Sequence, residues 1–401
     1  MRAIRTLYAL ICLLACTAAA AAEAPHISLL TCHAGPDIYE LCGHSAIRVR
    51  YPDSGIDYAA NYGLFDFDSP GFIYRFVKGE TDYMVGAHPY EMFLANYSRQ
   101  GRKVVEQHLD LTPEQATRLA ALLEENMRPE NRVYRYNYVL DNCATRCIDI
   151  LERAMADTIH FDAVAVEGTD GWSFRDEMRH YHRNYPWYQF GIDLALGTGI
   201  DYPITVREKS FAPEMMERLF ASASLPDSTG QLKPLVSATN IVAEGTGAPA
   251  TKSPTPWYLT PMAVCWTLFV IVAAISATDI RHHKHSRWLD TILFGAFGLA
   301  GCLIFFLVFI SEHYATSPNW LIVWLNPLCL CGAILPWIKK CGNVAAYYHT
   351  ANLAVVTLLL LLWRCTGQGY NWAFLPLMLS DMARSATYIY NWKCIRKKNI
   401  A

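Results

Sequence analysis

The sequence predicts an α+β domain that is exported from the cytoplasm, followed by an α-helical membrane domain. A short apolar leader opens the chain, segments typical of strands and helices follow to about residue 220, and long apolar stretches begin after residue 256. Of the 401 residues, 53% are hydrophobic, and most of the excess lies in these late stretches. A formal net charge of −2 argues against a nucleic-acid partner.

Residues 1–22 are predicted to be a secretory signal peptide. Arg2 and Arg5 precede a short apolar run and a string of alanines, and cleavage after Ala22 suits the small residues preferred at such sites. The sequence LLAC, which ends at Cys16, is an alternative signal that would leave this cysteine lipidated. Both signals export the segment that follows.

The exported domain is expected to span residues 23–220 and to contain both strands and helices. HSAIRVRY and IDYAANYG, residues 44–51 and 56–63, are separated by the turn-forming PDSG and predict a β-hairpin. Residues 111–127 predict a helix with a capping threonine and a proline in its first turn. The Ser-, Thr-, Gly- and Pro-rich residues 221–256 are interpreted as a linker.

The membrane domain is expected to occupy residues 257–392 and to cross the bilayer five times. Lysine and arginine are frequent in the loops that this topology places inside and in the basic tail, residues 393–401, and rare outside. The exported domain then faces the periplasm, and the C-terminus faces the cytoplasm. The five predicted spans are 257–277, 289–311, 320–338, 346–363 and 371–391, and Asn326-Pro327 is expected to kink the third.

A cysteine at the start of a predicted helix is the first candidate for chemistry. In YVLDNCATRCIDIL, residues 138–151, Asp141 or Asn142 can cap a helix whose first turn holds Cys143. The N-terminus of a helix lowers the pKa of a thiol and so favours a thiolate nucleophile. Two alternatives stay open: Cys143 is an apolar residue of the buried helix stripe, or it forms a disulfide with Cys147, for which one helical turn is poor geometry.

His44 begins the first strand of the hairpin and is the candidate general base. If PDSG forms the turn, Ala46 pairs with Asn61, which places Asn61 diagonal to His44 on the same face of the sheet. A cysteine at a helix N-terminus, a histidine and an amide that orients it are the parts of a thiol triad, here Cys143, His44 and Asn61. Asp57, farther along that face, is the second choice for the orienting residue.

A zinc site in TCHAGPDIYELCGH is a competing interpretation. The segment contains Cys32, His33, Cys42 and His44, all residue types that bind zinc. It has no C-x-x-C pair, and the side chains of an extended Cys-His dipeptide point apart. We therefore expect neither a metal nor another cofactor.

Four segments resemble a known family. CHAGPDIYELCGHSAIRV, NYGLFDF at 61–67, YNYVLDNCATRCIDIL and, in the membrane domain, SEHYATSPNWLIVWLNPL at 311–328 are similar to segments of the Lnb-type lipoprotein N-acyltransferases. A histidine strand that precedes the cysteine helix also resembles the circularly permuted branch of the NlpC/P60-like superfamily. The resemblance implies a papain-like fold for the exported domain, followed by a five-span membrane module.

The resemblance also implies a reaction. An acyl chain would pass from a membrane phospholipid to Cys143 as a thioester, and then to the α-amino group of the diacylglyceryl-cysteine of a lipoprotein. His44 would act as general acid and base. Backbone amides near Cys143 and Ala144 would stabilise the oxyanion, with Asp141 and Asn142 as supporting residues.

The implied partners are a phospholipid acyl donor, a diacylated lipoprotein acceptor and the bilayer itself. The implied location is the cytoplasmic (inner) membrane of a Gram-negative-type bacterium. Cys42 departs from the family, in which we expect an aromatic residue at this position. Two rival functions stay open: a cell-wall amidase or peptidase of the same fold, and a non-enzymatic binding module anchored in the membrane.

Three further features are interpreted with structural alternatives. Glu312 and His313 follow the second span and are candidates for a membrane-interface site, with simple anchoring as the alternative. Asp381 and Arg384 are one turn apart in the fifth span and are expected to pair with each other. The aromatic run within residues 62–76 is expected to be core, with an acyl-chain groove as the alternative.

Overall fold

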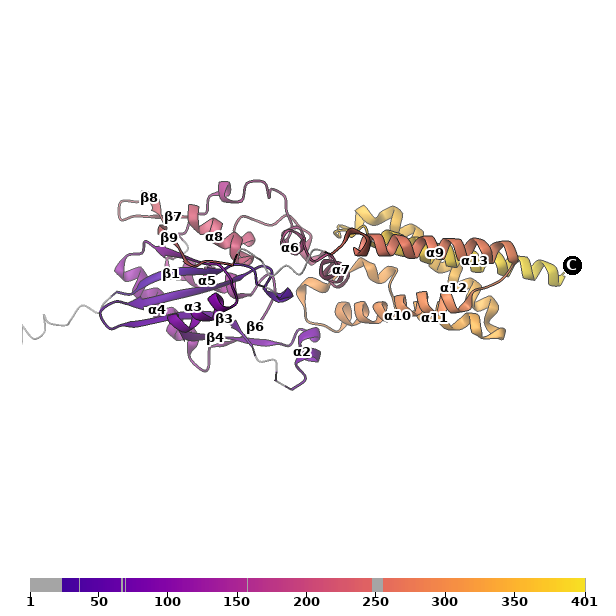
Figure 1. Cartoon of the computed structure of the whole chain (residues 1–401), viewed down its shortest axis with the longest axis horizontal. Coiled ribbons are helices and arrows are strands. Elements are labelled where there is room, and N and C mark those ends of the chain that lie inside the picture. The colour runs from indigo at the N-terminus through magenta and orange to yellow at the C-terminus, as the bar shows by residue number, and fades with distance from the viewer. Residues whose placement is uncertain are drawn as a thin grey trace, which may run out of the picture.

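The chain folds into a sheet-rich domain and a helical domain that lie end to end (Figure 1). This arrangement confirms the predicted α+β domain followed by a helical membrane domain. The predicted signal peptide, Cys16 and Phe67 lie outside the described residues. The computed structural model describes residues 24–35, 37–65, 68, 70–156, 158–246 and 255–400, with side chains to residue 396.

Seven antiparallel strands form the main sheet, in the order β6-β4-β3-β2-β1-β5-β9. β2 and β3 form the predicted hairpin, and they pair Ala46 with Asn61 and Arg50 with Asp57, which confirms the predicted register. The strands are β1 (His26–Cys32), β2 (His44–Tyr51), β3 (Ile56–Leu64), β4 (Asp82–Pro89), β5 (Val104–Leu109), β6 (Val133–Arg135) and β9 (Val236–Ala243).

Helices cover both faces of the main sheet. Side chains of β1 alternate between two apolar cores: Leu29 packs in the core with α4, α5 and α8, and Leu30 packs in the core with α3. Each fully buried leucine contributes about 1.5–3 kcal/mol to stability. The helices are α3 (Tyr90–Arg99), α4 (Pro113–Met127), α5 (Cys143–Ala154) and α8 (Pro213–Ser222).

The predicted helix at residues 111–127 is α4, and its start has the expected cap. Thr112 Oγ1 accepts a hydrogen bond from the backbone N–H of Gln115, and the Gln115 side chain accepts one from the backbone N–H of Thr112. Pro113 takes the first helical position, where a missing N–H costs nothing.

Residues 221–256, predicted to be a linker, are not a linker throughout. β7 (Ser224–Pro226) pairs with β8 (Leu232–Pro234), and β9 adds an edge strand to the main sheet beside β5. Most side chains of β9 are exposed, and among the described residues this strand lies at an edge of the sheet. An exposed edge strand tolerates the polar residues that suggested a tether.

The remaining helices of the first domain are short. α2 and α7 lie on the side of the sheet domain that faces the helical domain (Figure 1). These elements are α2 (Phe72–Lys78), α6 (Phe174–His182), α7 (Pro186–Ala195) and the 3-10 helices Ile38–Glu40, Ala163–Val166, Thr198–Ile200 and Glu208–Phe211.

Within the described residues, three helices of the second domain are long and apolar enough to cross a membrane. They are α9 (Pro261–His282), α10 (Arg287–Phe309) and the helical segment Lys339–Thr366, which contains α12 (Gly342–Leu362). These helices fall on three of the five predicted spans. Five crossings remain a prediction.

The other two predicted spans have different structures. Residues 320–338 are not one helix, because Asn326 and Pro327 separate a 3-10 turn from the short α11 (Cys329–Ile334). We predicted a kink at this proline within one span, and the break is larger than that. α13 (Phe374–Ile400) is a single helix that packs against α9 and α12.

Arg384 does not pair with Asp381, contrary to the prediction. Its Nε donates to Asp290 (2.6 Å) and its Nη1 to Asp279 (2.9 Å), whereas Asp381 Oδ2 accepts from the indole of Trp324 (3.2 Å). Other helices supply these partners, so the spacing of two charges along one helix did not reveal them.

Hydrogen bonds to backbone carbonyls attach the sheet domain to the membrane domain. The N–H of Gly197 donates to the carbonyl of Ala315 (2.8 Å), and Asn319 Nδ2 donates to the carbonyl of Leu194 at the end of α7 (3.0 Å). Residues 315–319 follow α10, so the sheet domain is held at the end of that helix.

Candidate functional site

Cys143 is the first residue of α5, and the preceding residue caps the helix. Asn142 Oδ1 accepts hydrogen bonds from the backbone N–H of Ala144 (2.8 Å) and Thr145 (3.0 Å), and Thr145 Oγ1 accepts one from the backbone N–H of Asn142 (2.7 Å). Of the two predicted caps, the structure therefore selects Asn142 rather than Asp141. This start places Cys143 in the first turn, where unpaired backbone N–H groups favour a negative charge.

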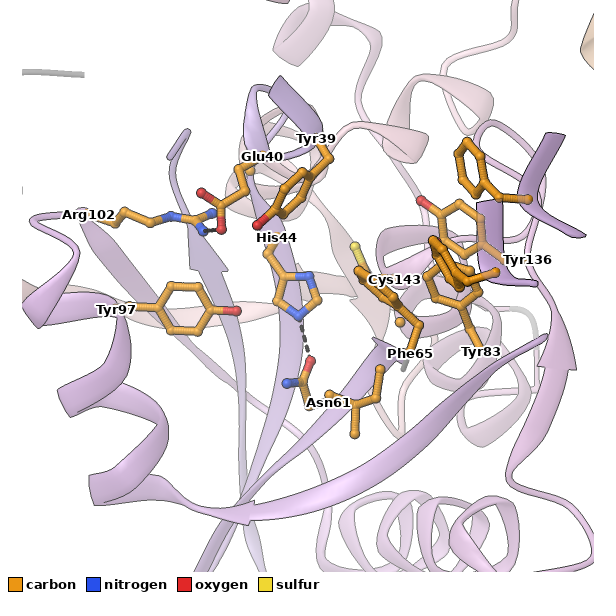
Figure 2. A pocket seen from close by; sticks show the side chains of 15 residues that line it. Tyr39, Glu40, His44, Asn61, Phe65, Tyr83, Tyr97, Arg102, Tyr136 and Cys143 are labelled. Carbon is orange, nitrogen blue, oxygen red and sulfur yellow. Dashed lines mark hydrogen bonds and ion pairs between the residues drawn. The ribbon is translucent and has the colours of Figure 1, made fainter. Parts of the chain in front are cut away.

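His44 and Asn61 are hydrogen-bonded on neighbouring strands, as the hairpin register predicted. The Nε2 atom of His44 lies 2.5 Å from Oδ1 of Asn61. An amide oxygen only accepts hydrogen bonds, so the proton of this bond belongs to Nε2, and Nδ1 is left for another partner. Cys143 lines the same cavity as His44, and Figure 2 shows the second ring nitrogen on the side of the sulfur.

The strand that carries Asn61 is irregular beside this pair. The register of β3 against β4 shifts between Asn61 and Leu64, and Gly63 has a φ of +89°. A Cβ added to Gly63 would lie 3.8 Å from Cβ of Cys143 and 3.9 Å from Cε1 of His44. The backbone of Gly63 therefore passes close to both side chains, in a conformation that favours glycine.

The surroundings of Cys143 favour the thiolate. Burial raises the pKa of the thiol, but the charge of His44, their hydrogen bond and the backbone amides of Ser45 and Ala144 bring the pKa below its ordinary value of 9.0. Burial lowers the pKa of His44, whereas the charge of Cys143 and hydrogen bonds with Cys143 and Asn61 bring it above 6.5. Together the two shifts favour a thiolate and imidazolium pair.

The pair lies in a cavity of about 380 Å³ that is polar on one side and aromatic on the other (Figure 2). On the polar side, Arg102 Nη1 donates to Glu40 (2.8 Å) and its guanidinium covers the ring of Tyr97, which stacks with His44 at a centroid distance of 6.1 Å. A cavity lined in this way suits a ligand that has an apolar chain and a polar group at its end. The aromatic side is lined by Leu64, Phe65, Phe72, Phe76, Tyr83 and Tyr136.

Three of these aromatic residues belong to the run that we expected to be core. Phe65, Phe72 and Phe76 line the cavity, which favours the groove alternative for them. Tyr62 is 1% exposed and belongs to the core, as expected. The sequence could not divide the run in this way, because the division depends on the shift in β3 and on where α2 packs.

Asp141 and Ala144 do not line the cavity. Asp141 Oδ2 accepts a hydrogen bond from Nη2 of Arg146 (2.6 Å), and the N–H of Ala144 already donates to the Asn142 cap. The backbone amide of Ser45, which lies directly after His44, is a further group that lowers the pKa of the Cys143 thiol. Sequence reasoning missed this donor, because a backbone group leaves no signal in residue identity.

Asp57, the second choice for the orienting residue, is bound elsewhere. Its Oδ2 accepts a hydrogen bond from Nη2 of Arg48 (2.6 Å), and Arg48 Nη1 donates to Glu106 (2.9 Å). Of the two candidates, only Asn61 bonds His44 in the structure.

The disulfide and zinc alternatives find no matching geometry in the described residues, whereas Cys143 does pack against the main core, as the apolar alternative predicts. Cys143 and Cys147 are both free, and Cys147 is fully buried, which raises the pKa of its thiol well above the ordinary range. In the part of the chain that the structure describes, no three His, Cys, Asp or Glu side chains gather as a metal site would require. His33, one of the four zinc candidates, instead bonds Glu217 (3.0 Å).

Glu312 and His313 lie outside the cavity and join the two domains. Glu312 Oε2 accepts a hydrogen bond from Nη1 of Arg135 (2.9 Å), and Nε2 of His313 donates to the carbonyl of Phe76 in α2 (2.6 Å). These contacts give both residues a structural place at the junction of the two domains, and a role at the membrane interface stays a prediction.

Arg102, Glu40 and Tyr97 were not predicted as site residues. Arg102 is 3% exposed, and its Nε also donates to the carbonyl of His33 (2.8 Å). The three residues come from a 3-10 turn, from α3 and from the loop after it. No motif links them along the chain, so only the fold brings them beside His44.

Comparisons with known families agree with the motifs. Residues 14–172 match the family model of the Lnb N-terminal periplasmic domain, and residues 253–397 match that of the Lnb transmembrane domain. Neither the curated proteins nor the solved structures gave a match. The two family matches follow in the expected order, cover most of the chain, and include Cys143, His44 and Asn61 in the first. The chain therefore belongs to the Lnb family of lipoprotein N-acyltransferases and joins a periplasmic domain to a transmembrane domain.

Proposed function

We propose that this protein transfers an acyl chain from a membrane phospholipid to the α-amino group of the diacylglyceryl-cysteine of a lipoprotein, through a thioester on Cys143. The observation that carries this proposal is the position of Cys143 beside the hydrogen-bonded pair His44 and Asn61, at a cavity with an aromatic side. Membership of the Lnb family supports the substrate class. No cofactor is needed for this chemistry.

In the first half-reaction, the thiolate of Cys143 attacks the carbonyl carbon of the phospholipid ester. The bond from this carbon to the glycerol oxygen breaks, and the imidazolium of His44 gives its proton to that oxygen, so a lysophospholipid leaves. The oxyanion forms near the first turn of α5, where the backbone N–H of Cys143 is the proposed donor. The Ala144 amide is less suited, because Asn142 already accepts its hydrogen.

In the second half-reaction, the α-amino nitrogen of the lipoprotein attacks the thioester carbonyl. His44 takes a proton from the nitrogen, the carbon–sulfur bond breaks, and the thiolate of Cys143 is restored. Asn61 holds the imidazole so that the same nitrogen serves both steps. Both substrates carry acyl chains in the outer leaflet of the cytoplasmic membrane. We place the periplasmic domain on this leaflet and the five spans within the bilayer.

The experiment replaces the proposed nucleophile and follows both the product and the acyl-enzyme. Mass spectrometry of lipoprotein N-termini is expected to find the amide-linked chain with the parent protein and to lose it with Cys143→Ser. Labelling from radioactive phospholipid, removable by hydroxylamine, is expected on the parent protein and on Cys147→Ala, whose cysteine is buried one helical turn away. Cleavage of cell-wall peptides without lipid would favour the hydrolase, and full activity of Cys143→Ala would leave only a binding module.

A further inference from the structure

The short helix α2 has apolar side chains on two sides. Phe72 and Phe76 line the cavity with Cys143, whereas Ile73 is 78% exposed and Tyr74 is 59% exposed. None of its residues is buried. Large apolar side chains that project together from a short surface helix indicate a contact with a partner or a membrane.

The end of α2 is bound to the segment that follows α10. The carbonyl of Val77 accepts a hydrogen bond from Oγ of Ser311 (3.1 Å), and the carbonyl of Lys78 accepts one from the N–H of Glu312 (2.7 Å). These carbonyls belong to the last turn of α2, which has no partners for them within the helix. Because α10 ends at Phe309, the contacts place α2 at the level where a span leaves the bilayer.

Aromatic side chains mark the same level. The ring of Tyr74 packs against that of Phe306 in the last turn of α10, with centroids 6.3 Å apart. Phe309, the last residue of α10, is 63% exposed, so the apolar surface of α2 continues into the lipid-facing surface of this helix. Exposed aromatic residues just after α10 and at the matching ends of the other membrane segments form the belt typical of an interface: Trp257, Tyr258, Tyr314, Trp320 and Trp372.

We propose that α2 lies in the outer leaflet, with Ile73 and Tyr74 among the lipid chains, and that a phospholipid acyl chain passes over α2 to reach the cavity of Cys143. The occupant of this surface is thus the donor phospholipid in its bilayer. Phe72 and Phe76 face the path on its cavity side, and Ile73 and Tyr74 face it on the membrane side. The second half of this inference rests on the proposed function, whereas the position of α2 in the leaflet does not.

The position is tested with a photoreactive benzophenone amino acid in the full-length protein, in nanodiscs of phosphatidylethanolamine and phosphatidylglycerol. The benzophenone amino acid replaces Ile73 in one variant and Ile56 in a second variant, and both variants also carry Cys143→Ala. Ile56 is 52% exposed and begins β3, so a nine-residue strand of roughly 30 Å separates it from the end that leads to α2. We expect phospholipid adducts at position 73 and none at position 56. Adducts only with protein, or no lipid adduct at position 73, would overturn the proposal.

The path is tested with Ile73→Asp and the matched control Ile56→Asp. With donor phospholipid in nanodiscs, Ile73→Asp is expected to slow thioester formation on Cys143 about tenfold, because a carboxylate on α2 disfavours its place among lipid chains. With dihexanoyl phosphatidylcholine below its micelle concentration, Ile73→Asp should form the thioester as fast as the parent protein. Ile56→Asp should form it as fast as the parent protein with both donors. Equal loss with both donors would mean that Ile73 only supports the cavity. A parent protein that forms no thioester with either donor would refute the proposed function instead, and the crosslinking result would still stand.

Discussion

The side chain of Asn61 fixes the imidazole of His44, because its Oδ1 lies 2.5 Å from Nε2 of the ring. The contact joins two residues that are 17 positions apart along the chain, on neighbouring strands of one hairpin, and it leaves the other ring nitrogen for the sulfur of Cys143. Each half of this relationship leads to a prediction that kinetics can check.

Asn61→Ala is expected to shift the upper limb of the pH profile to lower pH. The hydrogen bond with Asn61 raises the pKa of His44, so its loss lowers that pKa and the imidazolium loses its proton at a lower pH. The rate of thioester formation near neutral pH is expected to fall about tenfold or more. The measurement is this rate between pH 5 and pH 10, which brackets the ordinary pKa values of 6.5 and 9.0.

The chain offers a matched control for Asn61. Asn240 Nδ2 contacts Nε2 of His108 (3.1 Å) at an exposed place on β5 and β9, far from the cavity along the sheet. Asn240→Ala removes a similar pair and should leave the profile unchanged. An Asn61→Ala profile that matches the parent would show that Asn61 does not orient the base.

His44→Ala is expected to slow alkylation of Cys143 by iodoacetamide at neutral pH. Burial raises the pKa of this thiol, and His44 is the main influence that lowers it, so without His44 the pKa moves up. Each unit of that rise lowers the thiolate fraction about tenfold. The measurement is peptide mass spectrometry of the alkylated protein over time, from pH 5 to pH 9.

Cys147 is the internal control for this experiment. It is fully buried, its thiol pKa is raised, and it should resist alkylation in both proteins. Unchanged reactivity of Cys143 in His44→Ala would mean that the helix N-terminus alone activates the sulfur.

Asn142→Ala should destabilise the periplasmic domain more than Asn142→Ser. Alanine removes the bonds to the N–H groups of Ala144 and Thr145, whereas serine keeps a capping oxygen. Loss of such a cap costs about 0.5–2 kcal/mol. Both variants lose the Asn142 Nδ2 group, which donates to the carbonyls of Tyr138 and Phe211. The difference in stability between the two variants therefore isolates the contribution of the cap. Thermal unfolding of the purified full-length protein measures the difference, and equal midpoints would contradict it.

Gly43→Ala is expected to be more harmful than Gly55→Ala, although both residues have positive φ. A Cβ on Gly43 would lie 2.6 Å from the carbonyl oxygen of Cys32, whereas a Cβ on Gly55 meets nothing within 4 Å. The backbone strain alone costs about 1–2 kcal/mol in each variant. The clash adds to it in Gly43→Ala and displaces His44, the next residue.

Thermal unfolding and thioester formation of both glycine variants check this expectation. Gly55→Ala should lower only the unfolding temperature, and Gly43→Ala should lower it further and also lower the rate. Equal effects of the two variants would show that the backbone of Cys32 moves away from the added Cβ without displacing β2.

Much of the candidate site follows from local rules. Asn142 precedes a helical pattern, so it could be recognised as a cap, and Cys143 then had to start α5. The turn PDSG sets the hairpin register, and this register alone places Asn61 beside His44. The catalytic roles of these residues remain predictions.

The linker and the membrane domain show where local rules fail. Polar composition suggested a tether where β9 forms. β9 pairs with β5 alone and most of its side chains are exposed, so its residues can be as polar as those of a linker. The partners of Arg384 come from other helices, so no spacing within α13 indicates them. The break at Pro327 was expected only as a kink, because its extent depends on how the neighbouring helices pack.

The sequence by itself determined the order of the two domains, the export of the first, the helix start at Cys143 and the strand pairing that joins His44 to Asn61. These features depend on hydrophobic length, capping and turns, which act over a few neighbouring residues. Only the tertiary structure decided that α5 meets β2, that Arg102 and Tyr97 surround the histidine, and that α2 lies at the end of a membrane helix. Contacts between distant segments depend on the packing of whole elements, and no single stretch of sequence encodes that packing.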